Sequence, residues 1–176
     1  MRKLLVFDID QTLVDSSRRE NLSFFRDELN LEHYKAQKYC QVLGAKSDSL
    51  LPLGEVLEHH VLHNDFCLVT AREFEAVDFD VLGYLMPGTM LQAQIVINRN
   101  NCHLFGGDKR EQSSGIYKKP IFDWLKTFYS RELVVIDDCP KVLKVARDSG
   151  HIALCARDLW HLEKNDIMRV LENALY

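Results

Sequence analysis

The chain has 176 residues, about the length of one domain, and its apolar and charged residues occur in the proportions of an ordinary globular protein. The formal net charge of -4 excludes an overall attraction to nucleic acid but leaves room for a local basic groove. The sequence contains no apolar run long enough to cross a bilayer and no signal-peptide core. Its five cysteines form no CxxC pair, which argues against a disulfide framework or a zinc site. We therefore expect a reduced, cytoplasmic protein.

Short apolar runs rich in valine and isoleucine recur along the chain, and helical patterns separate them. Runs of this length and composition predict strands that are buried on both faces of a sheet. The predicted strands are Lys3–Phe7, Phe66–Val69, Gln94–Ile97, Leu133–Ile136 and Ile152–Cys155. Strands that alternate with helices form right-handed crossovers and a parallel sheet. The sequence therefore predicts an α/β fold, with a Rossmann-like, doubly wound parallel sheet of about five strands.

A long segment, Asp15–His63, separates the first two predicted strands. Its helical patterns are Leu22–Leu29, His33–Leu43 and Leu53–Leu62. Within a single domain over residues 1–176, the segment is either a small cap over a site or an enlarged crossover. The next segment, Glu73–Thr89, is less regular. The polar segment Asn98–Ser114 predicts an exposed loop or hairpin.

The second half of the chain predicts three helices. Pro120 suits a first helical turn, and the apolar residues after it predict a helix that begins there. Pro140–Ser149 carries an apolar stripe and ends at Gly150, a residue typical of helix termini. Asn165–Leu175 predicts a closing amphipathic helix.

Polar side chains follow three of the predicted strands at the point where each strand ends. They are Asp8 and Asp10 after the first strand, Thr70 and Arg72 after the second, and Asp137 and Asp138 after the fourth. In open parallel sheets, ligands bind beyond the carboxyl ends of the strands. We therefore expect these clusters to meet at one rim of the sheet and to form a site.

The two carboxylates that follow the first strand suit phosphoryl chemistry. Asp8 can attack phosphorus as a nucleophile, and Asp10 can hold a proton for the leaving group and later activate water. Like charges this close push the apparent pKa values apart, which suits one nucleophile and one acid. Without a metal, Asp8 and Asp10 would repel Asp137, Asp138 and the substrate phosphate. The expected cofactor is Mg²⁺, which prefers oxygen ligands and binds together with substrate phosphates.

Phosphoryl transfer also needs cationic and hydrogen-bonding groups around the phosphate oxygens. Thr70 offers a hydroxyl, and either Lys118 or Lys119 offers a positive charge near a predicted helix. Arg72 and Arg99 each follow a predicted strand and are candidates for a further clamp. An equally open interpretation makes Arg72 a surface partner of a neighbouring glutamate.

Taken in chain order, these residues resemble the four motifs of the haloacid dehalogenase (HAD) superfamily. The most specific match is the first motif, Val-Phe-Asp-Ile-Asp-Gln-Thr-Leu, and the resemblance runs from residue 4 to about residue 150. The sequence departs from the pattern at Gln11, where the superfamily has glycine. The superfamily's dehalogenase and ATPase branches lack an acid at the position of Asp10, so the resemblance favours a phosphatase.

The resemblance also implies a role for each matching residue. Asp8 would be the nucleophile and a metal ligand, Asp10 the general acid and base with its backbone carbonyl on the metal, Thr70 and a lysine the phosphate binders, and Asp137 with Asp138 the acidic metal ligands. Within the superfamily, the chain is loosely similar to the phosphatase half of polynucleotide kinase-phosphatases. That similarity implies that Arg72 and Arg99 contact the substrate phosphate and favours Lys118 as the lysine.

We therefore predict a magnesium-dependent phosphomonoester hydrolase that works through an aspartyl-phosphate. The expected substrate is a nucleotide or a nucleic-acid terminal phosphate, because basic residues cluster in the sequence near the site. They are Arg99, Lys109, Arg110, Lys118 and Lys119. The alternatives are a phosphotransferase or phosphomutase on the same fold, and a non-catalytic HAD-like binding module.

Overall fold

A five-stranded parallel sheet forms the centre of the protein. The structure, a computed structural model, describes residues 3–17, 24–25, 28–29, 47–59 and 65–176. The strands of the sheet, in the spatial order β7-β6-β1-β8-β9, are β7 (Ile95–Ile97), β6 (Phe66–Val69), β1 (Leu4–Phe7), β8 (Leu133–Asp137) and β9 (Ile152–Cys155). All four pairings are parallel. The predicted α/β fold is confirmed, and each strand lies within a residue of its predicted bounds.

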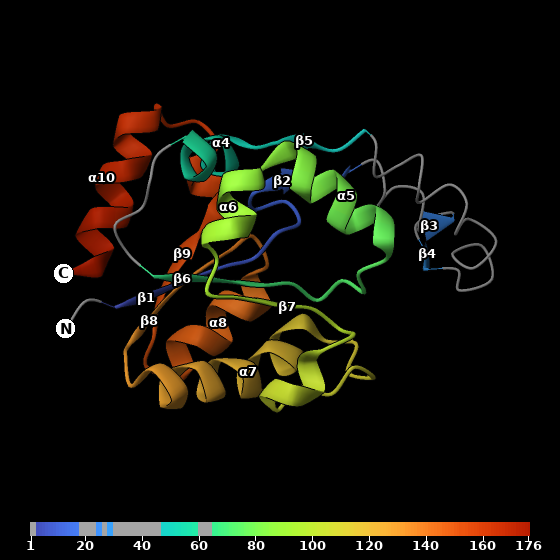
Figure 1. Cartoon of the computed structure of the whole chain (residues 1–176). Helices are drawn as coiled ribbons and strands as arrows, with labels where there is room; N and C mark the ends of the chain where they lie inside the picture. The colour runs from blue at the N-terminus through green and yellow to red at the C-terminus, as the bar shows by residue number, and fades with distance from the viewer. Residues whose placement is uncertain (1–2, 18–23, 26–27, 30–46, 60–64) are drawn as a thin grey trace.

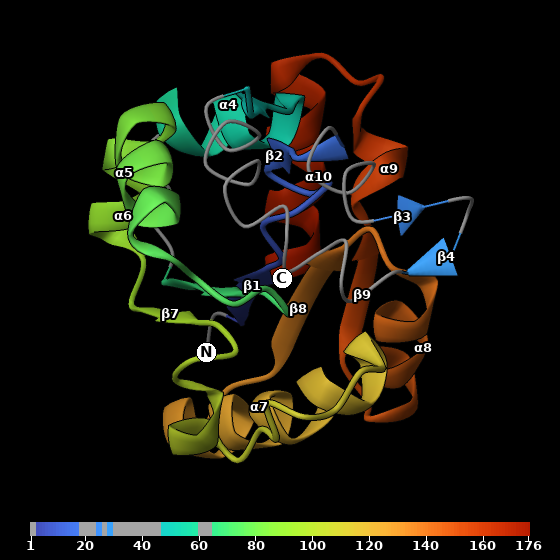
Figure 2. The same cartoon turned by 90° about the vertical axis from the view of Figure 1, so that its right-hand side faces the viewer.

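Helices cover both faces of this sheet (Figures 1 and 2). Leu4 and Val6 of β1 contribute to one core cluster and Leu5 and Phe7 to the other, as the alternation of side chains along a strand requires. One cluster contains side chains of η1 (Cys102–Phe105), α7 (Ser114–Tyr129) and α8 (Pro140–Asp148). The other contains side chains of α4 (Pro52–His59), α5 (Ala76–Leu85), α6 (Pro87–Gln92), α9 (Ala156–Leu159) and α10 (Lys164–Leu175). None of the described helices is long and apolar enough to span a membrane.

Two pairs of very short strands lie outside the central sheet. β2 (Val14–Asp15) pairs antiparallel with β5 (Ser49–Leu50), and β3 (Phe24–Phe25) pairs antiparallel with β4 (Glu28–Leu29). The predicted helix Leu22–Leu29 is therefore wrong at its described residues, because strand pairing overrides a short helical pattern there. The predicted helix His33–Leu43 lies outside the described residues.

The segment Glu73–Thr89, expected to be less regular, contains the helix α5 and the start of α6. Apolar residues lie all round α5, so the segment lacks the one-sided pattern by which an amphipathic helix is recognised. The start of α5 is instead defined by a capping box, in which Glu75 and Asp78 accept hydrogen bonds from each other's backbone N–H groups. Reciprocal contacts of this kind satisfy amide groups that the first helical turn leaves unpaired.

Helix α7 begins at Ser114 and not near Pro120, which lies inside the helix. A proline there removes one helical hydrogen bond. Tertiary packing outweighs this loss, because the earlier turns of α7 carry Tyr117 into the core and bring Gly115 against α8. A Cβ atom at Gly115 would lie 2.9 Å from the Lys141 carbonyl oxygen, so only glycine allows this approach.

Candidate active site

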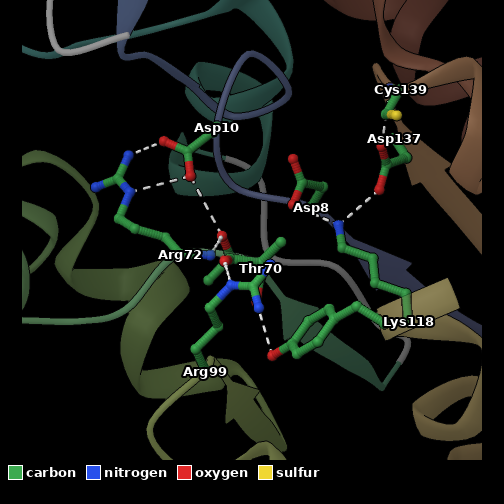
Figure 3. A network of polar contacts seen from close by, with 10 residues as sticks. Asp8, Asp10, Thr70, Arg72, Arg99, Lys118, Asp137 and Cys139 are labelled. Atoms are coloured by element: carbon green, nitrogen blue, oxygen red, sulfur yellow. Dashed lines mark hydrogen bonds and ion pairs between the residues drawn. The ribbon is translucent and has the colours of Figure 1, made fainter. Parts of the chain in front are cut away.

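The polar residues that follow the strands converge at the carboxyl edge of the sheet (Figure 3). Asp8 follows β1, Thr70 follows β6 and Asp137 ends β8. Because β1 lies between β6 and β8 in the sheet, these three residues are neighbours in space. Lys118 reaches the same place from α7, which lies against one face of the sheet.

The Lys118 ammonium bridges two carboxylates, and we call Asp8, Lys118 and Asp137 the Lys118 centre. Its Nζ atom lies 2.6 Å from Asp8 Oδ1 and 2.7 Å from Asp137 Oδ2, and all three side chains are buried. Asp137 Oδ1 accepts a further hydrogen bond of 2.8 Å from the Cys139 backbone N–H. Of the two candidate lysines, Lys118 thus lies in the site, whereas Lys119 pairs with Asp123 on the exposed side of α7.

Burial controls the electrostatics of this centre. It raises the pKa of Asp8 to about 7, because Lys118 offsets only part of the cost of removing the carboxylate from water and Asp137 adds repulsion. Burial alone would lower the pKa of Lys118, but the attraction of Asp137 and Asp8 outweighs it and raises that pKa. Lys118 is therefore a permanent positive charge inside the site.

The donor set at this edge fits a hard divalent cation. One carboxylate oxygen from each of Asp8, Asp137 and Asp138 lies within 4.8 Å of the others. A cluster of carboxylate oxygens with room for water and a substrate phosphate is the environment that Mg²⁺ prefers. Asp10 was predicted to serve the metal through its backbone carbonyl, and its carboxylate lies outside this group and contacts Arg72.

A second cation, the Arg72 guanidinium, joins Asp10 to an acid that the sequence analysis missed. Arg72 Nε donates to Asp10 Oδ2 at 3.0 Å and Nη2 contacts Asp10 Oδ1, while Nη1 donates to Asp78 Oδ1 at 2.9 Å. We call Asp10, Arg72 and Asp78 the Arg72 centre. Burial lowers the pKa of Arg72, and the charge of Asp78 opposes that effect. The Glu75-x-x-Asp78 spacing was a sequence signal for a helix start, but not for a link to the site.

Thr70 connects the strand end to the Arg72 centre. Its Oγ1 atom donates to Asp10 Oδ2 at 3.2 Å and accepts from the Arg72 backbone N–H at 3.1 Å. The Tyr117 hydroxyl donates to the Thr70 carbonyl oxygen at 3.3 Å, inside the core. The Thr70 hydroxyl is therefore held between Asp10 and the Arg72 backbone, and the Thr70 carbonyl group is held by Tyr117.

Arg99, predicted to contact the substrate phosphate, donates hydrogen bonds to backbone carbonyl groups in this structure. Its Nε atom donates to the Ala71 carbonyl oxygen, and Nη1 donates to the Lys109 and Glu111 carbonyl oxygens, each at 2.7 Å. The guanidinium carbon lies 4.7 Å from the centre of the Tyr117 ring. These contacts attach the loop before α7 to the segment after β6.

The turn that carries Asp10 explains why the superfamily has glycine at the position of Gln11. Gln11 has a φ of 54°, in the left-handed region, and its backbone N–H donates to the Val14 carbonyl oxygen at 2.8 Å. For a residue other than glycine this conformation costs roughly 1–2 kcal/mol. Helix α4 supports the turn closely, since a Cβ atom at Gly54 would lie 2.2 Å from the Leu13 carbonyl oxygen.

Comparison with known proteins agrees with this fold. The sequence model of the bacteriophage T5 5'-deoxynucleotidase family matches residues 1–174. No curated protein matches the sequence. A haloacid dehalogenase-like hydrolase from Streptococcus pneumoniae has a similar structure, with a TM-score of 0.64, 12% identity and coverage of 96% of this chain and 98% of that chain. A predicted phosphoglycolate phosphatase from Haemophilus somnus has a TM-score of 0.56 and 15% identity over 87% of this chain and 84% of its own.

At such low identity, the two solved structures are informative about the fold alone. The family match is stronger, because it extends over nearly the whole chain and includes every carboxylate of the site. The prediction of a HAD-type phosphatase is confirmed. The chain belongs to the bacteriophage T5 5'-deoxynucleotidase family and is a phosphatase with the HAD fold.

Proposed function

We propose that this phosphatase hydrolyses the 5'-phosphate of deoxynucleoside monophosphates and uses Mg²⁺ as its cofactor. The observation that carries the proposal is the separation of the two motif carboxylates. Asp8 lies beside Lys118 and the other acids, while Asp10 lies beside Arg72 and the Thr70 hydroxyl. The family supports the substrate class, since its namesake is a 5'-deoxynucleotidase.

In the first step, a carboxylate oxygen of Asp8 attacks phosphorus and forms the aspartyl-phosphate. The bond from phosphorus to the 5'-oxygen breaks, and that oxygen receives its proton from Asp10. Lys118, which has one proton beyond those given to Asp8 and Asp137, would bind a phosphate oxygen, and Thr70, predicted to do the same, would have to turn its hydroxyl proton from Asp10 to the phosphate. Mg²⁺ held by Asp8, Asp137 and Asp138, with the predicted Asp10 carbonyl, would neutralise charge on the phosphate.

In the second step, water attacks the phosphorus of the aspartyl-phosphate. Asp10, now ionised, accepts a proton from the water, and the bond between phosphorus and the Asp8 oxygen breaks. Inorganic phosphate leaves, and both carboxyl groups return to their starting states. Arg72 and Arg99 were predicted to clamp the phosphate, but their contacts with carboxylates and backbone carbonyls favour supporting roles.

The segment 15–63 was predicted to be a small cap or an enlarged crossover, and we also propose that its part between β2 and β5 serves as the cap, because α4 packs into the core of the domain. The pairing of β2 with β5 brings the two ends of residues 16–48 together beside the turn that carries Asp10. An insertion whose ends meet at the rim of a site is suited to covering it. The described residues on either side then belong to one domain.

The test is release of inorganic phosphate from a substrate panel, with and without Mg²⁺. The panel contains deoxynucleoside 5'- and 3'-monophosphates, 5'-phosphorylated oligonucleotides and sugar phosphates, and Asp8→Asn is the control. We expect magnesium-dependent release from the 5'-monophosphates that is lost in Asp8→Asn. Preference for sugar phosphates or oligonucleotides would overturn the substrate class, and activity dependent on a bisphosphate activator would instead indicate a phosphomutase.

A further inference from the structure

Asp78 lies outside the four superfamily motifs, yet it is joined to the site through Arg72. We infer that Asp78 is a positioning residue that acts through Arg72 to hold Asp10 for proton transfer to the leaving group. The inference rests on the proposed function, because it assigns Asp10 the acid and base role. It gives Arg72 a different task from the phosphate contact that the sequence predicted.

The first part of the argument is the geometry of the guanidinium. Arg72 faces both oxygens of Asp10 through Nε and Nη2, and it faces Asp78 through Nη1. A two-point contact between a planar guanidinium and a carboxylate fixes the plane and the rotation of the carboxylate. A guanidinium that lies between two carboxylates is also largely neutralised, so it attracts a phosphate less than a free arginine would.

The second part is the anchoring of Asp78 itself. Asp78 is only 3% exposed, and its second oxygen accepts a hydrogen bond of 2.8 Å from the Glu75 backbone N–H. That bond belongs to the capping box at the start of α5. Asp78 therefore connects Arg72 to the first turn of a helix, whereas Thr70 connects Asp10 to the end of β6.

The third part is which oxygen of Asp10 is available for the proton. Oδ2 accepts from both the Thr70 hydroxyl and Arg72 Nε, so its two lone pairs are occupied. Among the described residues, Oδ1 contacts only Arg72 Nη2 and keeps a lone pair for the transferred proton. Arg72 thus orients Oδ1 as the atom that gives its proton to the 5'-oxygen and later takes one from water.

The experiment compares two substrates that differ in their need for an acid. A deoxynucleoside 5'-monophosphate expels an alkoxide, which needs a proton, whereas p-nitrophenyl phosphate expels a phenolate that leaves without one. The comparison uses the rate of the first step, measured as release of nucleoside or of p-nitrophenolate in a single turnover, because hydrolysis of the aspartyl-phosphate is common to both substrates. For Asp78→Asn we expect this rate on the nucleotide to fall by about 10- to 100-fold, at or below the lower limit of what general acid catalysis contributes, since Asp10 itself remains. We expect the first-step rate on p-nitrophenyl phosphate and both KM values to stay near those of the unchanged enzyme.

Asp80→Asn is the matched control, because Asp80 is an exposed acid on the same helix. It should leave both rates unchanged. In Asp10→Asn, as in Asp78→Asn, the first-step rate should fall more on the nucleotide than on p-nitrophenyl phosphate, and the difference between the two losses should be larger. If Asp78 acts through Asp10, adding Asp78→Asn to Asp10→Asn should cause little further loss on the nucleotide.

Three outcomes would overturn the inference. They are equal losses of the first-step rate on both substrates, a rise in the nucleotide KM at unchanged kcat, and full activity in Asp78→Asn. Asp78→Ala gives a stronger change, and its rate on p-nitrophenyl phosphate reports whether it has folded. If the unchanged enzyme prefers another alkyl phosphate, the proposed substrate fails, but the same comparison can be made with that compound.

Discussion

The Lys118 centre and the Arg72 centre have the same composition, one cation between two carboxylates, but they differ in burial and in the task that we assign to each. In each, one cation joins a carboxylate of the first motif to an acid from a distant part of the chain. The Lys118 centre is the more buried, with the lysine side chain 3% exposed against 16% for Arg72. It also lies beside Asp138, which makes it the region suited to a metal.

This difference separates the two tasks of phosphoryl transfer. A nucleophile benefits from positive charges that hold both it and the phosphate, which the Lys118 centre provides. A proton donor must be turned toward the leaving group, a task that we assign to the Arg72 centre through Asp78 and Thr70. Two carboxylates that are two residues apart in the sequence thus acquire different surroundings.

The largest effect that would test the comparison is on turnover. Asp8→Asn should reduce kcat by about 10⁴-fold or more, because no nucleophile remains. Asp10→Asn should reduce kcat on nucleotides by about 10²- to 10⁴-fold, the range of general acid–base catalysis. Phosphate release from the purified variants checks both values. A larger loss in Asp10→Asn than in Asp8→Asn would reverse the assigned roles.

The second effect is on stability. Lys118→Met should lower the free energy of unfolding by about 3–5 kcal/mol, since it leaves two buried carboxylates without their cation. Arg72→Met should lower it by about 1–3 kcal/mol, because its partners are more accessible to water or remain hydrogen-bonded to the backbone. Urea unfolding of both variants without metal gives the two values. Equal losses would show that the centres do not differ in burial energetics.

The third effect concerns the metal. At a Mg²⁺ concentration of about 100 times its dissociation constant, binding should add about 2.7 kcal/mol to the free energy of unfolding. Asp137→Asn should abolish most of this stabilisation, while Asp78→Asn should retain it. Thermal unfolding with and without Mg²⁺, repeated with a chelator, makes the comparison. Loss of the Mg²⁺ effect in Asp78→Asn would place the Arg72 centre in the metal site.

The smallest effect concerns the support of the Asp10 turn. Gly54→Ala should destabilise the protein by about 1–3 kcal/mol, because the new methyl group overlaps the Leu13 carbonyl oxygen. Gly83→Ala is the matched control, since it lies in the exposed part of a helix with nothing within 4 Å of the new atom. It should stabilise by up to about 1 kcal/mol, as alanine generally does in a helix. Similar unfolding midpoints for the two variants would argue against a tight α4 contact.

Much of the fold and several site residues followed from local patterns in the sequence. Short apolar runs are typical of buried strands, so the bounds of all five strands of the sheet were predicted closely. The carboxylates Asp8, Asp10, Asp137 and Asp138 were found because reactive groups of a parallel sheet follow its strands directly. These inferences need no knowledge of which distant segments meet.

Only the tertiary structure decided how the carboxylates are partnered. Lys118 is 110 residues from Asp8, and only the family resemblance, not the chemistry of the local sequence, favoured Lys118 over Lys119 as the lysine of the site. The choice depends on where α7 begins, which packing against α8 determined in spite of Pro120. Asp78 was missed because its helix has apolar residues on every side and was not predicted. Its link to the site through Arg72 also depends on tertiary packing. Sequence patterns specify strands and their ends, whereas the pairing of charges depends on long-range packing that brings helices to the edge of the sheet.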